Sequence, residues 1–151
     1  MKATLAAVLI AAAAGSANSQ ALPDVLRAYK EASVREAWLC TMSYDTYVIN
    51  VLTERGLARY GAASAPQGLE EAQKCVKDAK FTIMSYFQSS KLLPLSAGAA
   101  SALREHMVAV NTQLEGLAPA EGESRSVYER RRAAEAARAK EAWFRVELEL
   151  R

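Results

Sequence analysis

Apolar residues recur every three or four positions through most of this chain, as they do along the buried face of an amphipathic helix. Almost no stretch alternates apolar and polar residues in the way that a half-buried strand would. Four segments carry the helical pattern: about 24–55, 64–93, 96–115 and 126–150. The pattern therefore predicts an all-α protein.

The same periodicity predicts which residues of each helix face inward. On the first helix they are Leu26, Tyr29, Ser33, Ala37, Cys40, Tyr44, Tyr47 and Val51. On the second they are Leu69, Ala72, Val76, Ala79, Ile83 and Tyr86, with Cys75 beside them. On the third they are Ala99, Leu103, His106, Val110 and Leu114, and on the fourth, after a run of alanines, Ala139, Trp143, Val146 and Leu150.

Residues at the segment ends agree with these boundaries. Asp24 suits the positive end of a helix dipole, and Gly56 is a natural stop for the first helix. Ser64 followed three residues later by Gln67 is a capping box at the start of the second helix, which Pro94 ends.

Helices joined by short loops most simply form an up-down-up-down bundle. Cys40 and Cys75 support this topology, because the midpoint between them falls near Leu57, in the loop rich in glycine and alanine that joins the first two helices. In an antiparallel hairpin, residues equidistant from the turn are neighbours. We therefore predict a disulfide between Cys40 and Cys75, worth about 3–4 kcal/mol in the chain-entropy model. Two buried free thiols are the alternative.

Residues 1–21 are typical of a cleavable export signal, with Lys2 ahead of a short apolar segment at 5–14 and small residues after it. About ten apolar residues are too few to span a bilayer, which takes about twenty. Cleavage is expected after Ala21 or after Ser19, which leaves 22–151 as one helical domain. A periplasmic or secreted location would favour the disulfide. No later segment is apolar enough to be a transmembrane helix.

Net charge does not point to a partner. Lys2 would leave with the signal, so eighteen of the nineteen basic residues would remain beside seventeen acidic ones, a net charge of about +1. The export signal and the interleaving of acidic with basic residues both argue against nucleic acid.

Motifs for catalysis, metal binding or cofactor binding are lacking in the sequence. His106 is the only histidine, and it lies on an apolar stripe, where a hydrogen-bonded core histidine is the expectation. There is no C-x-x-C, no Glu-x-x-His pair of a bundle metal site and no G-x-S-x-G motif. We therefore predict no catalytic, metal or cofactor site, and a protein that is not an enzyme.

The charged C-terminal helix, within 125–151, is the most suggestive functional feature. It follows a polar loop at 118–124 that we expect to be mobile. It is either docked on the bundle by its aromatic end or projects from a three-helix body toward a partner. The expected partner-binding residues are Arg130, Arg131, Arg132, Arg138, Trp143 and Phe144.

These features predict an exported small helical protein that acts by protein–protein interaction. An inhibitor, an immunity-type protein, a chaperone-like protein and an envelope-assembly partner all fit this description, and a homo-oligomer stays open. The alternative is a carrier of a small ligand in a pocket between helices lined by tyrosines. The candidate tyrosines are Tyr29, Tyr44, Tyr47 and Tyr86.

Overall fold

The computed structural model describes residues 22–51 and 65–151, which form four helices. Their bounds are α1, Asp24–Val51; α3, Ala65–Ser90; α4, Ala97–Glu115; and α5, Arg125–Glu149. These ranges contain no strand, so the all-α prediction is confirmed. The predicted export signal, the stop at Gly56 and the cap at Ser64 lie outside the described residues.

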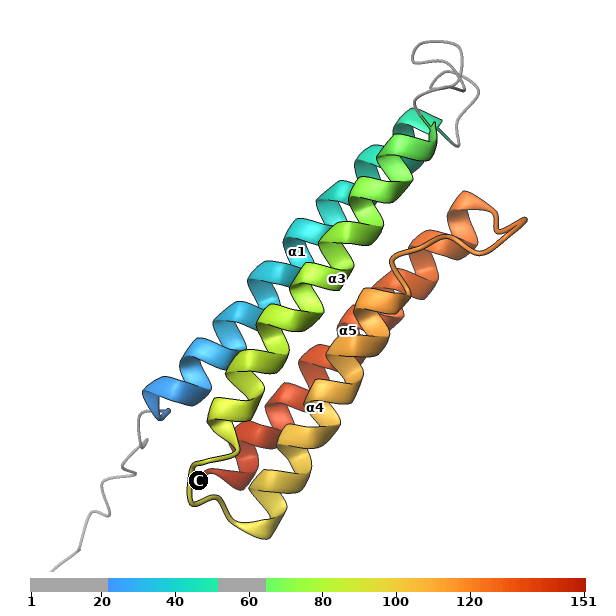
Figure 1. The fold of residues 1–151 in the computed structure, drawn as a ribbon. Helices are drawn as coiled ribbons and strands as arrows, with labels where there is room; N and C mark the ends of the chain where they lie inside the picture. Colours follow the sequence, from blue (N-terminus) through green and yellow to red (C-terminus); the bar gives the residue numbers. More distant parts are fainter. Residues whose placement is uncertain (1–21, 52–64) are drawn as a thin grey trace, which may run out of the picture.

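The helices pair as two antiparallel hairpins that lie lengthwise side by side (Figure 1). Helix α1 packs along α3, and α4 packs along α5, while the contacts between the two hairpins are fewer. The chain therefore folds as the predicted up-down bundle. Helix α5 docks along α4, so the alternative of a projecting C-terminal helix is not adopted.

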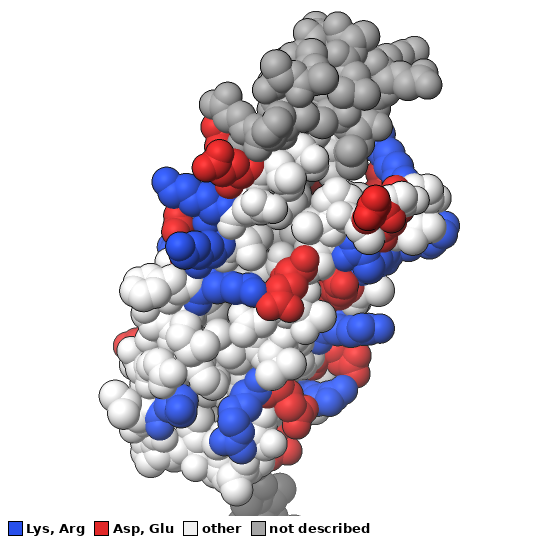
Figure 2. All heavy atoms as spheres, turned by 45° about the vertical axis from the view of Figure 1, so that its right-hand side comes forward, with Lys and Arg blue, Asp and Glu red and all other residues white. Residues whose placement is uncertain are grey.

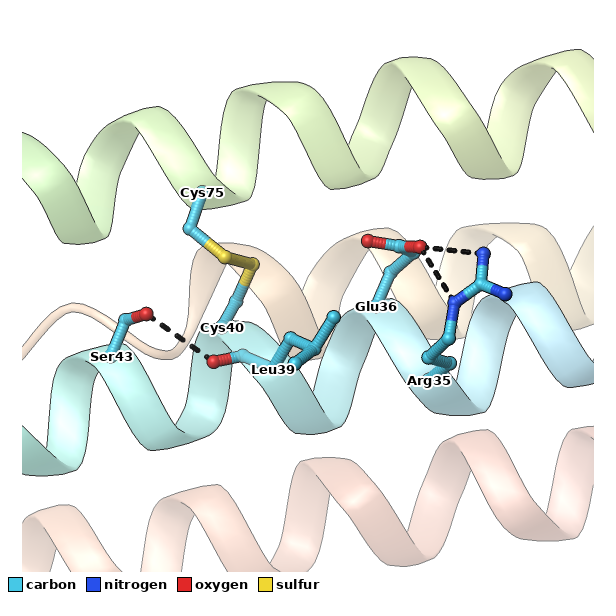
Figure 3. The surroundings of a disulfide bond; sticks show 6 residues. All are labelled: Arg35, Glu36, Leu39, Cys40, Ser43 and Cys75. Atoms are coloured by element: carbon cyan, nitrogen blue, oxygen red, sulfur yellow. Dashed lines mark hydrogen bonds and ion pairs between the residues drawn. A yellow bond between two sulfur atoms is a disulfide. The ribbon is translucent and has the colours of Figure 1, made fainter.

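The disulfide between Cys40 and Cys75 joins the two helices of the first hairpin (Figure 3). The two Cα atoms are 5.5 Å apart, within the usual range for a bridged pair. Cys40 is fully buried and belongs to the core cluster, and Cys75 is partly buried against it. The predicted bridge is confirmed, and it fixes the register of α1 against α3.

Most predicted inward residues are buried, including all five on α4. The buried residues differ from the predicted ones near the ends of two helices. Val48 is buried where Tyr47 was expected, and Phe87 is buried where Tyr86 was expected. Steps of three and four average less than the 3.6 residues of a helical turn, so a strict stripe drifts off the core face over several turns. Each tyrosine then lies at the edge, where its hydroxyl can reach water.

Helix α4 begins as the sequence predicts. The Ser96 hydroxyl accepts a hydrogen bond from the backbone N–H of Ala99 at 3.0 Å, which is an N-cap. The helix ends at Gly116, whose backbone N–H donates to the carbonyl of Thr112. A strong start and a defined end hold α4 in register, and its inner face forms the floor of the site described below.

Candidate functional site

A groove of about 560 Å³ runs between α1 and α5, with α4 as its floor. It exists because these two helices approach each other closely at few points. The facing side chains are small: Ala37 on α1 and Ala136 and Ala139 on α5 all line the groove. Alanine methyl groups cannot fill the space between two helices, so the alanine run of α5 leaves a channel open to solvent.

Large apolar side chains stand on both rims of this groove. Val34 and Trp38 of α1 are 64% and 59% exposed, and Phe144 of α5 is 52% exposed. Each leaves more than half of its surface in water, which costs free energy in proportion to the apolar area. Clustered exposed apolar residues around a concave surface are typical of a binding site.

Two ion pairs tie α1 to α5, one at an end of the groove and one beyond its other end. At one end the Lys30 ammonium lies 2.8 Å from the Glu147 carboxylate. One turn beyond the other end, the Arg132 guanidinium contacts the Asp45 carboxylate. Lys30 and Asp45 are fifteen residues apart on α1, as are Arg132 and Glu147 on α5. At 1.5 Å per residue the two ion pairs are about 22 Å apart, and the groove itself, lined from Lys30 to Thr41 on α1, is about 16 Å long.

The Lys30–Glu147 pair is built into the packing of Trp143. The indole N–H of Trp143 donates to the same Glu147 oxygen at 2.6 Å, and the Lys30 ammonium lies 5.1 Å from the centre of the indole ring. Hydrogen bonds from Lys30 and Trp143 lower the pKa of Glu147 below its usual value. Trp143 is buried, so its contacts are with its own chain.

The floor of the groove contains the one histidine of the chain. The Nδ1 atom of His106 lies 2.9 Å from the Tyr29 hydroxyl, and its ring packs edge-on against those of Tyr29 and Trp143. Burial lowers the pKa of His106 to about 4, and the nearby Lys30 charge acts in the same direction. Burial likewise raises the pKa of Tyr29. His106 is therefore a neutral, hydrogen-bonded core histidine, as the sequence predicts.

The six residues expected to contact a partner do not form one surface. Arg132 pairs with Asp45, and Trp143 is buried. Arg130 and Arg138 are exposed, but neither lines the groove. Of the six, only Phe144 is both exposed and on its rim.

Arg131, the remaining member of that set, holds the loop between α4 and α5. Its guanidinium donates to both carboxylate oxygens of Glu123, at 2.9 and 2.8 Å, and to the carbonyl oxygens of Gly116 and Ala118. The hydrogen bond from Arg131 is the main reason that the pKa of Glu123 falls to about 2. The loop expected to be mobile is held to α5 by these partly exposed hydrogen bonds.

The rim residues on α1 were missed by the sequence analysis. Val34 and Trp38 lie just beside the predicted seam of α1, which assigns neither of them an inward position. A tryptophan next to a helix seam is a weak signal, because its exposure depends on what the neighbouring helix places opposite it. Here that neighbour offers Ala136 and Ala139, so Trp38 stays uncovered.

The four candidate tyrosines are not gathered in one cavity. Tyr29 and Tyr44 are buried in the core, and Tyr86 is exposed on α3. Tyr47 lines a second hollow of about 520 Å³, together with Tyr128 and the loop that contains Glu121. The larger groove has aromatic rims of tryptophan and phenylalanine instead.

The surface charge of the face shown in Figure 2 is mixed, with basic and acidic side chains next to one another. Across 22–51 and 65–151, no cluster of His, Cys, Asp and Glu is large enough to hold a metal ion. None of the four described helices combines the length and apolarity needed to cross a membrane. No protein-family model matches the chain, and no curated protein or solved structure matches it either.

Proposed function

We propose that this protein is an exported binding protein whose working surface is the groove between α1 and α5, and that its ligand is another protein. One observation carries the proposal: Val34, Trp38 and Phe144 stand more than half exposed on the two rims of an apolar channel. Exposed aromatic side chains around an alanine-lined depression resemble the anchors at the centre of protein–protein interfaces.

Export is part of the proposal. It is supported by the residue pattern of 1–21 and by the disulfide between Cys40 and Cys75, a bond that persists mainly in oxidising compartments. An inhibitor, an immunity-type protein, a chaperone-like protein or an envelope-assembly partner would each act through such a surface.

Binding fits the groove better than catalysis does. The charged residues at its ends are engaged with each other, as in the Lys30–Glu147 pair, and His106 is held neutral by burial and bonded to Tyr29. A general base would need a titratable group free to take up a proton near neutral pH. The groove offers apolar surface instead.

The test uses two rim substitutions and one control. Trp38→Ser and Phe144→Ser remove exposed anchors without touching the core, so both variants should fold with the native helix content and thermal midpoint. Each should lose the partner captured from envelope extracts by the wild-type protein. Phe81→Ser is the matched control, since Phe81 is 77% exposed on α3 and does not line the groove. Capture that survives both rim substitutions would rule out this surface.

A small apolar ligand is the second candidate function, and the groove volume favours it. A cavity of about 560 Å³ lies within the range that holds small molecules, roughly 300–1,000 Å³. Native mass spectrometry of the purified protein distinguishes the two functions, because a carrier would retain a bound molecule that Trp38→Ser releases.

A further inference from the structure

The charges of α5 are unevenly neutralised. Four of the five glutamates of this helix are held in ion pairs, Glu129, Glu135, Glu141 and Glu147, and Glu149 forms none with a described residue. Three of its basic residues form no ion pair with any described residue: Arg130, Arg138 and Lys140. Helix α5 therefore presents net positive charge that the fold does not balance.

Lys140 places part of this charge at the groove itself. It is exposed, lines the groove, and lies one turn from Phe144 on the same rim. On the opposite rim, Val34 and Trp38 lie four residues apart along α1 and are both exposed. Lys30 and Glu147, the other charged side chains that line the groove, pair with each other, so the unbalanced charge of the groove is that of Lys140 on the α5 lip.

Both lips are ridges of side chains spaced four residues apart. Lys30, Val34 and Trp38 form one ridge, and Ala136, Lys140 and Phe144 form the other. Ridges of this spacing accept the matching ridges of another helix. The described residues contain no strand edge to which an extended peptide could add. The walls of the groove are therefore suited to a helix.

We propose that the partner inserts an amphipathic helix into this groove, with its apolar face on the alanines and an acidic flank beside Lys140. The inference rests on the proposed function and specifies the chemistry of the partner. The groove is about 16 Å long and accommodates about eleven residues of a guest helix, close to three turns. Large apolar side chains of the guest would lie over Ala136 and Ala139 and between Trp38 and Phe144, in the helix-in-groove mode of recognition.

The experiment uses two synthetic helical peptides of about 15 residues as probes. Both have leucine at every third or fourth position, and one flank carries glutamates in the first peptide and lysines in the second. Fluorescence anisotropy is measured with the full-length protein at low and at high salt. The acidic peptide should bind more tightly than the basic one, and added salt should weaken its binding by screening.

Substitutions assign the binding to the groove. Trp38→Ser should weaken the acidic peptide about tenfold or more, as loss of a central aromatic anchor does. Lys140→Glu should weaken the acidic peptide and strengthen the basic one. Lys77→Glu, which makes the same charge change on an exposed residue of α3 away from the groove, should leave both affinities unchanged. Laurate serves as a small apolar ligand that would compete for the groove if the groove held small molecules. Laurate in excess should fail to displace the acidic peptide.

The outcomes separate this inference from the proposed function. If the basic peptide binds as tightly as the acidic one or more tightly, the acidic-helix inference is overturned. If Trp38→Ser then abolishes binding of the basic peptide, docking still takes place in the groove. No binding of either peptide, or displacement by laurate, overturns the helical occupant. The proposed function fails separately, if the rim variants of the capture experiment keep the partner.

Discussion

The hydroxyl of Tyr29 on α1 and the Nδ1 atom of His106 on α4 form a buried hydrogen bond that joins the two hairpins beneath the groove. It is one of the few polar contacts between the hairpins, and its partners also pack against Trp143 of α5. The floor of the groove is therefore buried and closely packed, and the rims are exposed to solvent. This arrangement suits a protein that binds without rearranging its core.

Removing this hydrogen bond should cost stability. Tyr29→Phe leaves the ring in place but deprives buried His106 of its partner, and an unsatisfied buried polar group costs about 1–3 kcal/mol. Urea unfolding at neutral pH measures the change. Tyr86→Phe removes a hydroxyl from an exposed tyrosine of α3 and should leave stability within about 0.5 kcal/mol of wild type. Equal effects of the two substitutions would contradict the importance of the buried pair.

The stability of the fold should fall as the pH drops below about 6.5. The pKa of His106 is about 4 in the folded protein against the ordinary 6.5, so the unfolded chain binds this proton first. The loss in the free energy of unfolding should begin near pH 6.5, reach about 3 kcal/mol near pH 4 and then level off. Its size follows from the difference between the two pKa values at 1.36 kcal/mol per pKa unit. Urea unfolding between pH 7 and pH 4 measures it.

A histidine-free variant isolates that contribution. His106→Gln cannot take up the proton, so its stability should stay level from pH 6.5 to about pH 4.5. A carboxylate whose pKa is lowered in the folded protein, such as that of Glu147, contributes stability at pH values above the ordinary pKa of glutamate. This contribution is lost only as the pH falls below that value. A variant that loses stability from pH 6.5 downward as the wild type does would refute the assignment to His106.

Arg131 should hold the α4–α5 loop far more firmly than its neighbour Arg130 does. Arg131→Ala removes the hydrogen bonds to Glu123 and to two loop carbonyls, and we expect the free energy of unfolding to fall. The Ala120 amide, which donates to Glu123, should exchange its hydrogen faster. Arg130→Ala is the matched control and should change neither quantity. Equal exchange in the two variants would mean that the loop is held by other contacts.

The disulfide should contribute stability rather than activity. Replacing Cys40 and Cys75 by serine should reduce the free energy of unfolding by about 3–4 kcal/mol, the chain-entropy value for a loop of this length. Circular dichroism should show the same helix content below the transition, because the core of α1 and α3 remains. If the serine variant binds the acidic peptide as tightly as the wild type, the bridge contributes to stability alone. If the variant loses this binding, the bridge is also needed for the groove.

The helices and the bridge could be predicted because both depend on local regularities. The periodicity of α1 and α3 predicts which face of each helix is buried. The midpoint between Cys40 and Cys75 falls in the predicted loop between them, which predicts that α1 and α3 pair as an antiparallel hairpin. The roles of the arginines could not be predicted in this way. Arg130, Arg131 and Arg132 differ by about 100° in direction around the helix axis, so one faces solvent, one the loop and one Asp45. Which is which depends on residues distant in sequence.

The groove was beyond prediction for a related reason. It results from packing that is missing between α1 and α5, and sequence periodicity reports only packing that is present. The alanine run of α5 was visible, but it was equally compatible with close packing of two helices. Only the separation of the hairpins, bridged by the Lys30–Glu147 and Arg132–Asp45 pairs, shows that Ala136 and Ala139 line a groove.

Site-specific photocrosslinking tests the groove as a docking surface most directly. A photoreactive phenylalanine analogue is placed at position 38 or, as the control, at position 81, both of which are aromatic and exposed. In envelope extracts, position 38 should give a discrete crosslinked partner that excess acidic helical peptide suppresses, and position 81 should not. The same crosslinked product from both positions, or from position 81 alone, would contradict the account.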